Sequence, residues 1–421
     1  MTAILTAIAA AVMQPAPAQP ATEAERQVEQ AQQALGRGDY LEAVDGLRAA
    51  AFTPEGTPNP AGFGTWLYVH PYVGGVLDPA ALAREPAGPL VEAVAERFRR
   101  AEVRDALREI SARAAQTRIV ILNEAHESPR DRAFALEVAR ALRPLGYSVL
   151  AAETFSNRPG QGGDADAMER LRRDGYPRRD TGTYTMDPVF ADFVRQSLVL
   201  GYRPVAYEST THRPELGEIE QIALREQEQA ETLVARIFSN DPNARVLIYV
   251  GLMHAAEVPM PMAGGVSIEW MAARLKRMTG IDPLTIDQTL LDETVPRHHG
   301  YRALIAGRLD ERPVSLFLGG RPLIEARPPG TTDLQVVHPP LRLLRGRPAW
   351  LWRIGRRPVS IPRRLLPRSG RRLIQAFVAG EAADAVPLDQ IVVEAGRRAP
   401  PLLVPPGTRI RWAHQDPAPL D

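Results

Sequence analysis

The chain has 421 residues, of which 44% are hydrophobic and 24% are charged, a composition that argues against both disorder and an integral membrane protein. A formal net charge of +1 provides no overall positive field for non-specific nucleic-acid binding, so we expect no nucleic-acid partner. Cysteine is absent, which excludes disulfide frameworks, thiolate metal sites and cysteine nucleophiles and leaves histidine and carboxylates as metal ligands.

Residues 1–18 resemble a secretory signal peptide. The apolar stretch MTAILTAIAAAV precedes a Pro/Ala-rich segment in which Ala16-Pro17-Ala18 has the small residues of a cleavage site. The stretch lacks Lys and Arg at its start, and a disordered alanine-rich leader is the alternative. No segment is long enough to span a bilayer as a helix. We therefore predict a periplasmic or secreted protein with no transmembrane segment in the mature chain.

Residues 19–114 are predicted to form an N-terminal helical region. The segment AQQALGRGDYLEAVDGLRAA resembles a single tetratricopeptide-type helical hairpin, which cannot bury its own apolar face and is expected to pack on the main domain. The Gly/Pro/aromatic stretch 52–75 is predicted to be a loop, and 89–115 to be helical.

Residues 115–345 are predicted to form an α/β catalytic domain with a mainly parallel sheet flanked by helices. Short β-branched runs alternate there with amphipathic helical runs, which is the pattern of parallel strands joined by helices. The predicted strands are 118–122, 147–153, 202–208, 245–251 and 283–287. Three of the four intervening helices end at a glycine, as a C-cap does.

Residues 346–421 are predicted to form a C-terminal β-rich accessory module, with strands in RRLIQAFVAG, DQIVVEAG, PLLVPPG and TRIRWAH. Between 302 and 372, arginines far outnumber acidic residues. This arginine-rich region predicts contact with an anionic surface such as a phospholipid or a cell-wall polymer, and a solvated face is the alternative.

Four successive predicted strands each lead into a glutamate or a histidine. The first runs into Glu124 and His126, the second ends at Glu153, the third at Glu208, and the fourth is followed by His254. Because the carboxyl ends of parallel strands share one edge, where ligands bind, we expect these side chains to converge.

Carboxylates at one edge repel one another unless they share protons, arginine partners or a cation. Two imidazoles with carboxylates suit a divalent ion such as Mn, Co or Zn, which would activate water while a glutamate acts as general base. Without a metal, His126 would be the general base and the glutamates would orient it. On the helix after the third strand, Arg225 and Glu226 either pair with the site or form part of a solvated face.

The segment NEAHESPRDR resembles the Gly-Glu-x-His motif of the erythromycin esterase, ChaN and Tiki (TraB-like) superfamily. The strand-end glutamates, the helix segment REQEQA and the segment GLMH resemble later motifs of that superfamily, in the same order, over roughly residues 115–290. Asn123 replaces the first glycine, and we expect this to change the turn rather than the chemistry, since asparagine tolerates left-handed backbone angles better than most residues. Gln229 replaces a methionine, which we expect to change packing.

The resemblance, nearest to the ChaN-like haem-uptake branch, implies that His126 and His254 are metal ligands or the catalytic base. It places Glu124, Glu153 and Glu208 in supporting or ligand roles, with His126, Glu153 and His254 as the metal set. We predict an exported hydrolase of ester or peptide bonds, a metal-dependent esterase or protease, acting on a small molecule or a peptide. The alternative is an extracytoplasmic haem- or iron-binding protein in which Tyr207 is a candidate axial ligand. A third hypothesis is a scaffold with an inactive core.

Overall fold

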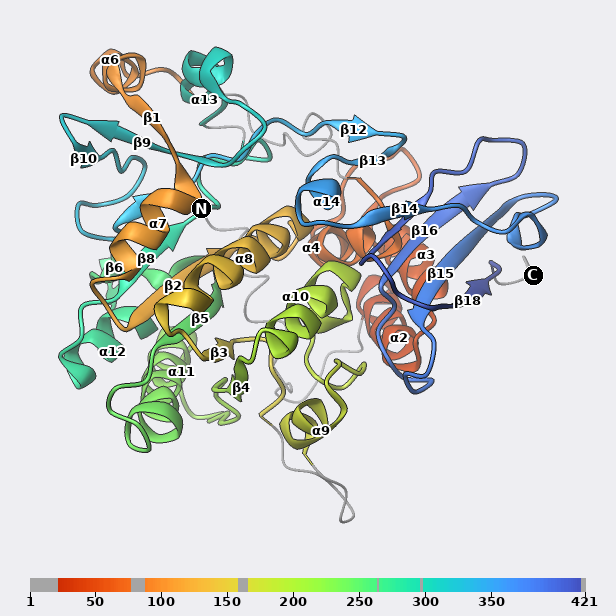
Figure 1. The fold of residues 1–421 in the computed structure, drawn as a ribbon, viewed down its shortest axis with the longest axis horizontal. Coiled ribbons are helices and arrows are strands. Elements are labelled where there is room, and N and C mark those ends of the chain that lie inside the picture. The colour runs from red at the N-terminus through yellow and green to blue at the C-terminus, as the bar shows by residue number, and fades with distance from the viewer. Residues whose placement is uncertain (1–21, 77–87, 158–165, 263–264, 296–297, 418–421) are drawn as a thin grey trace.

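The computed structural model describes residues 22–76, 88–157, 166–262, 265–295 and 298–417. The predicted signal peptide, 1–18, lies outside the described residues. The chain contains N-terminal helices, a parallel sheet flanked by helices, and C-terminal antiparallel strands (Figure 1). The predicted fold class is therefore confirmed.

The centre of the molecule is a six-stranded parallel sheet of order β11-β8-β2-β5-β3-β4. Its strands are β2 (Ile119–Glu124), β3 (Val149–Ala152), β4 (Arg203–Ala206), β5 (Val246–Gly251), β8 (Leu284–Asp287) and β11 (Leu334–Gln335). The five predicted strands are present, and β11 adds a sixth. Because both faces of the sheet are covered, its strands are continuous apolar runs without a polar alternation.

Helices cover both faces of this sheet. Val120 and Leu122 of β2 belong to the core that includes α7 (Ala106–Ala114), α8 (Pro129–Leu142) and α10 (Pro188–Val199). Ile119 and Ile121 belong to the opposite core, with α11 (Glu218–Leu233) and α12 (Met271–Thr279). This division follows from the alternation of side chains along a strand. Two further helices are α9 (Ala167–Asp174) and α13 (His299–Ile305), and β6 (Met260–Pro261) pairs with β7 (Ser267–Ile268).

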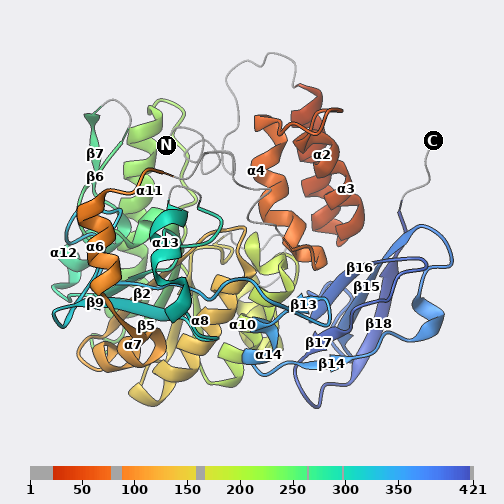
Figure 2. The ribbon, with the colours of Figure 1, turned by 90° about the horizontal axis from the view of Figure 1, so that it is seen from above.

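The predicted N-terminal hairpin is formed by α2 (Glu23–Arg37) and α3 (Tyr40–Ala51), with Gly38 at a φ of 91° in the turn. The stretch 52–75 is not a loop, because it contains α4 (Pro60–Val69) and η1 (His70–Val73). Pro60 occupies the first helical position, where proline favours a helix. Figure 2 shows these helices lying over the C-terminal strands, and their core includes Leu373.

The segment 89–115 is not one helix. It forms α6 (Glu92–Arg100), strand β1 (Glu102–Asp105) and α7. Strand β1 pairs antiparallel with β9 (Val314–Leu318), which also pairs with β10 (Arg321–Pro322). Pairing with a strand distant in sequence overrides the local helical preference of β1.

The C-terminal strands are all antiparallel. They are β12 (Leu343–Leu344), β13 (Arg347–Pro348), β14 (Arg357–Val359), β15 (Arg371–Val378), β16 (Asp389–Glu394), β17 (Leu402–Val404) and β18 (Ile410–Gln415), with α14 (Trp350–Arg353) after β13. Leu351 and Leu403 pack in the core on the α8 side of the central sheet, so this part is joined to the rest by apolar contact. Over the described ranges, no helix is both long enough and apolar enough to cross a membrane.

Candidate functional site

The carboxyl edge of the central sheet brings the predicted strand-end residues together. Glu124 ends β2 and His126 lies in the following turn, while Glu153 and Glu208 follow β3 and β4. His254 lies in η5 (Leu252–Ala255), directly after β5. Since β2, β5, β3 and β4 are successive neighbours in the sheet, these side chains come from adjacent strand ends.

A chain of buried ion pairs orients His126. Its Nδ1 lies 2.9 Å from Glu124 Oε1, which favours a proton on Nδ1 and leaves Nε2 as a proton acceptor. Arg132 is fully buried and donates to both oxygens of Glu124, at 2.9 and 3.1 Å, and to the carbonyl oxygen of His126 at 2.7 Å. Arg132 also donates to Asp187 Oδ2 at 2.8 Å. Burial raises the pKa of Glu124, but Arg132 and His126 outweigh it, and the pKa lies below its ordinary value.

The ring of His126 contacts Tyr184 and lies close to the backbone of β5. It stacks on Tyr184 with centroids 4.1 Å apart, and 16% of its side chain is exposed. A Cβ on Gly251 would lie 2.8 Å from His126 Nε2 and 3.0 Å from Glu153 Oε2. Only glycine permits this approach. The proton acceptor of His126 and the Glu153 carboxylate therefore flank the same backbone position.

Glu153 links this side of the site to His254. Its Oε2 accepts a hydrogen bond from the Gly251 N–H at 2.5 Å, and its Oε1 accepts one from Arg225 Nη2 at 2.7 Å. His254 Nε2 lies 3.4 Å from the same Oε1. Burial raises the pKa of Glu153, but His254 and Arg225 hold it well below its usual range. Glu153 is thus an ionised carboxylate among cations.

His254 is a buried cation. It is 3% exposed, and its Nδ1 lies 2.9 Å from Glu226 Oε2. Burial lowers the pKa of His254, but the carboxylates of Glu226 and Glu153 raise it to about 10. Glu226 is itself fully buried in α11 and accepts a hydrogen bond from the Met271 N–H at 2.8 Å, so it does not belong to a solvated face.

Arg225 is the second cation of the site. It donates from Nε and Nη2 to the two oxygens of Glu208, at 2.9 and 2.5 Å. Gln229 donates to the same oxygens at 3.1 and 3.0 Å. The change from methionine to Gln229 therefore adds a polar contact to a site carboxylate and is more than the packing change that we expected.

The expected metal set, His126, Glu153 and His254, does not fit a divalent ion in the arrangement that the structure describes. Within the described ranges, no three or more His, Asp or Glu side chains are disposed to hold a metal. The two oxygens of Glu153 are engaged by Gly251 and Arg225. Both ring nitrogens of His254 also have protein partners, Nδ1 with Glu226 and Nε2 with Arg225 and Glu153. Arg225 and His254 contact the site carboxylates and neutralise them, which is the role that the sequence suggested for a metal.

Tyr207 precedes Glu208 but does not point to solvent at this edge. It is fully buried in the apolar layer between the sheet and α11, and its hydroxyl has no hydrogen-bond partner among the described residues. A side chain without exposed surface offers no ligand to an incoming haem. Haem binding stays a prediction for which no axial ligand is assigned.

Sequence reasoning missed Arg132, Tyr184 and Asp187. Arg132 lies near the start of α8, and its place in the charged run PRDR after His126 was an available signal. Asp187 caps α10 by accepting a hydrogen bond from the Val189 N–H, so Asp-Pro marked a helix start but not an ion pair. Nothing near Tyr184 in the sequence indicates that it stacks on His126.

The arginine-rich region 302–372 contains arginines with and without internal partners. Most of its arginines bond within the molecule, as Arg347 does with Asp389 and Arg356 with Asp192. The same holds for Arg302, Arg308, Arg342, Arg353, Arg371 and Arg372. By contrast, Arg363, Arg364 and Arg368 are exposed and have no partner within the described part of the chain. We call these three the basic loop.

No protein-family model and no curated protein matches the chain. Among solved structures, the type III effector HopBA1 is 12% identical with a TM-score of 0.31, covering 45% of this chain and 87% of HopBA1. RRSP, a MARTX toxin effector domain from Vibrio vulnificus CMCP6, is 14% identical with a TM-score of 0.32, covering 59% of this chain and 54% of that one. A structure described as bacterial protein toxins is also 14% identical, with a TM-score of 0.34 and coverages of 61% and 56%. Likeness at this level carries no argument about function.

Proposed function

We propose that this chain is an exported hydrolase of ester or peptide bonds. In this proposal the Glu124–His126 pair activates water, and Arg225 with His254 stabilises the negative charge that develops on the substrate. The observation that carries it is the position of His126 Nε2, which lies against Gly251 near the Glu153 carboxylate that Arg225 and His254 contact. Export rests on the resemblance of residues 1–18 to a signal peptide.

His126 has the contacts that a general base requires. Glu124 fixes the ring through Nδ1, so Nε2 takes a proton from water as the oxygen attacks the carbonyl carbon. When the resulting adduct collapses and the C–O or C–N bond breaks, the same proton passes from Nε2 to the leaving group. Glu124 remains ionised throughout, because Arg132 holds it in that state.

The cations Arg225 and His254 support the proposed stabilisation of negative charge on the substrate. The carbonyl oxygen becomes an oxyanion during attack, and fixed cations in a water-poor site stabilise that charge strongly. His254 is buried and Arg225 is mostly buried, with 21% of its side chain exposed. Their positions are set by Glu226 and Glu208, so little reorganisation is needed during the reaction.

The test is a screen of the purified protein on chromogenic esters and quenched-fluorescence peptides, with and without Mn, Co or Zn. We expect activity without added metal, and we expect His126→Gln and His254→Gln each to lower it by about 100-fold or more. His414→Gln is the matched control, since that histidine is exposed. Normal activity in a His126→Ala, His254→Ala double variant would overturn the proposal. A stoichiometric, chelator-sensitive metal would replace this mechanism by the metal-dependent one.

We also propose that the expected anionic contact is made by the basic loop rather than by region 302–372 as a whole. These three neighbouring arginines have no partner in the described part of the chain, so no carboxylate offsets their charge before a polyanion binds. The backbone bond from the Ala395 N–H to the Gly370 carbonyl brings the turn that carries Arg397 and Arg398 close to this loop. An anionic phospholipid surface is the partner that we propose.

A further inference from the structure

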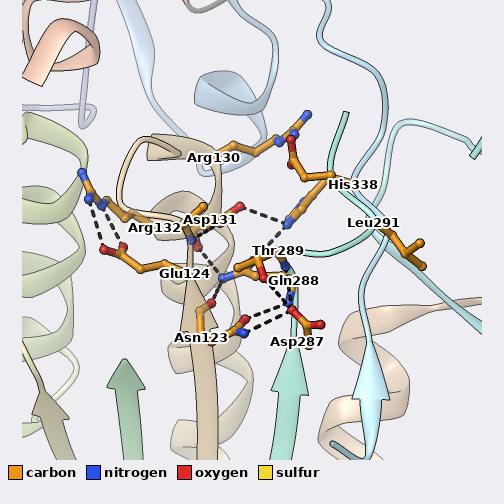
Figure 3. A network of polar contacts seen from close by, with 12 residues as sticks. Asn123, Glu124, Arg130, Asp131, Arg132, Asp287, Gln288, Thr289, Leu291 and His338 are labelled. Carbon is orange, nitrogen blue, oxygen red and sulfur yellow. Dashed lines mark hydrogen bonds and ion pairs between the residues drawn. The ribbon is translucent and has the colours of Figure 1, made fainter. Parts of the chain in front are cut away.

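The side chain of Asn123 connects three strand ends behind the site. Asn123 lies in β2, directly before Glu124, and is 1% exposed. Its Nδ2 donates to the Leu252 carbonyl oxygen at 3.0 Å and to Asp287 Oδ1 at 3.1 Å, and its Oδ1 accepts from the Gln288 N–H at 2.9 Å. Figure 3 shows Asn123 facing Asp287 and Gln288 at the ends of β2 and β8.

Leu252, one of these partners, has a strained backbone. Its φ is 34°, in the left-handed region that non-glycine residues seldom occupy. Leu252 begins η5, the turn that carries His254. Its carbonyl oxygen is the group to which Asn123 donates, so the hydrogen bond acts on the strained peptide itself.

Asp287 and Gln288, the partners of Asn123 at the end of β8, make further hydrogen bonds. Asp287 Oδ1 also accepts from the N–H and hydroxyl of Thr289, at 2.9 and 2.8 Å. Gln288 donates from Nε2 to the Asn123 carbonyl oxygen at 2.7 Å, and its Oε1 lies 2.9 Å from His338 Nε2. All these residues are buried, so the side-chain amide of Asn123 is held from several directions (Figure 3).

We propose that Asn123 is a positioning residue that fixes the turn bearing His254 relative to the strand bearing Glu124 and, through Glu124, His126. The left-handed turn that we expected at Asn123 is not formed, since Asn123 is extended in β2 and Leu252 has the positive φ. The role therefore belongs to the side-chain amide, which presents a donor and an acceptor together. Only the catalytic consequence of this inference rests on the proposed function.

Substitutions at Asn123 and Thr289 distinguish a positioning role of the Asn123 amide from a general contribution to packing. Asn123→Ala leaves the Leu252 carbonyl and the Gln288 N–H without partners. Asn123→Asp keeps the shape but turns carboxylate oxygens toward Asp287 and the same carbonyl, so we expect a larger effect. Thr289→Val is the matched control, because it removes a buried hydrogen bond to Asp287 without touching Leu252.

The test is amide hydrogen exchange of the full chain, which needs no substrate. The Gly251 N–H bonds to Glu153 and the Ala256 N–H bonds to the Met253 carbonyl, so both amides report on the turn. In Asn123→Ala we expect them to exchange faster by about tenfold or more, the effect of losing a buried hydrogen bond. Wild-type exchange rates in that variant, or an equal increase in Thr289→Val, would overturn the inference.

A second variant tests the role of strain. Leu252→Gly adopts the positive φ without cost, so the effect of Asn123→Ala on exchange should be smaller in that background. An unchanged effect would refute the inference. With a substrate in hand, Asn123→Ala should lower kcat and leave KM nearly unchanged. If no substrate is hydrolysed, the proposed function fails while the exchange result still decides the role of Asn123.

Discussion

Replacing Glu226 by glutamine tests the charge state of His254. Glu226→Gln keeps the shape of the side chain and an acceptor for the Met271 N–H, but removes the carboxylate that contributes most to raising the His254 pKa. The difference between the usual 6.5 and about 10 corresponds to about 5 kcal/mol of stabilisation. Breaking a buried ion pair costs about 3–5 kcal/mol, which agrees. We therefore expect a loss of stability of about 3–5 kcal/mol near neutral pH.

The stability that Glu226→Gln removes depends on pH, in a direction set by the raised pKa of His254. His254 binds its proton more tightly in the folded chain than in the unfolded chain, because its folded pKa is raised. The stabilisation is therefore complete below about pH 6.5 and declines by about 1.4 kcal/mol for each pH unit until about pH 10. The stability difference between the wild type and Glu226→Gln should be largest near pH 6 and should nearly vanish near pH 10.

Urea unfolding from pH 6 to 10 measures this difference, and nitrogen NMR of labelled histidine measures the pKa of His254 directly. Glu231→Gln is the matched control, since Glu231 lies on the same helix, is exposed, and should give a small and pH-independent change. A wild-type-to-variant difference that stays constant from pH 6 to 10, or a pKa of His254 that does not fall in Glu226→Gln, would refute the reasoning.

Three further predictions concern Gly251, Arg132 and the basic loop. Gly251→Ala should displace the ring of His126 and abolish hydrolysis of any substrate found in the screen. Gly307→Ala is the control and should leave hydrolysis unchanged, because a Cβ there has no atom within 4 Å. Equal rates in the two variants would contradict the close approach of His126 to Gly251. Arg132→Lys should destabilise the chain by about 3–5 kcal/mol in urea unfolding, because an ammonium group cannot make the forked hydrogen bonds of a fully buried guanidinium. A loss of stability below about 1 kcal/mol would be inconsistent with this reasoning. Reversing the charge of the basic loop should abolish salt-sensitive binding to anionic liposomes, and binding that persists would exclude the loop as the contact.

The parallel sheet could be predicted because its strands are apolar on both faces and are separated by amphipathic helices. The strand-end residues followed from topology alone, since parallel strands direct their carboxyl ends to one edge. The partners of those residues could not be predicted in the same way. Arg132 and Tyr184 approach His126 through tertiary packing, and no local period or motif marks such contacts.

The predictions of a loop at 52–75 and of a helix at β1 were wrong for the same physical reason. The glycines and prolines of 52–75 suggest a loop, but Phe63 and Trp66 find apolar partners that stabilise α4. Strand β1 has a helical sequence neighbourhood, but β9 supplies a backbone partner from a distant part of the chain. In both places a tertiary contact outweighs the local propensity.

The contact between the N-terminal hairpin and the last strand has a consequence for biosynthesis. Leu41 donates its N–H to Gln415 Oε1 at 3.0 Å, and Gln415 donates in turn to the Gly38 carbonyl at 2.6 Å. A ribosome synthesises this hairpin long before its partner β18, because Leu41 and Gln415 are 374 positions apart, so the hairpin lacks these contacts until β18 has been made. Contacts between segments so distant in sequence slow folding, because the entropy of closing the long loop must be lost before the contacts form.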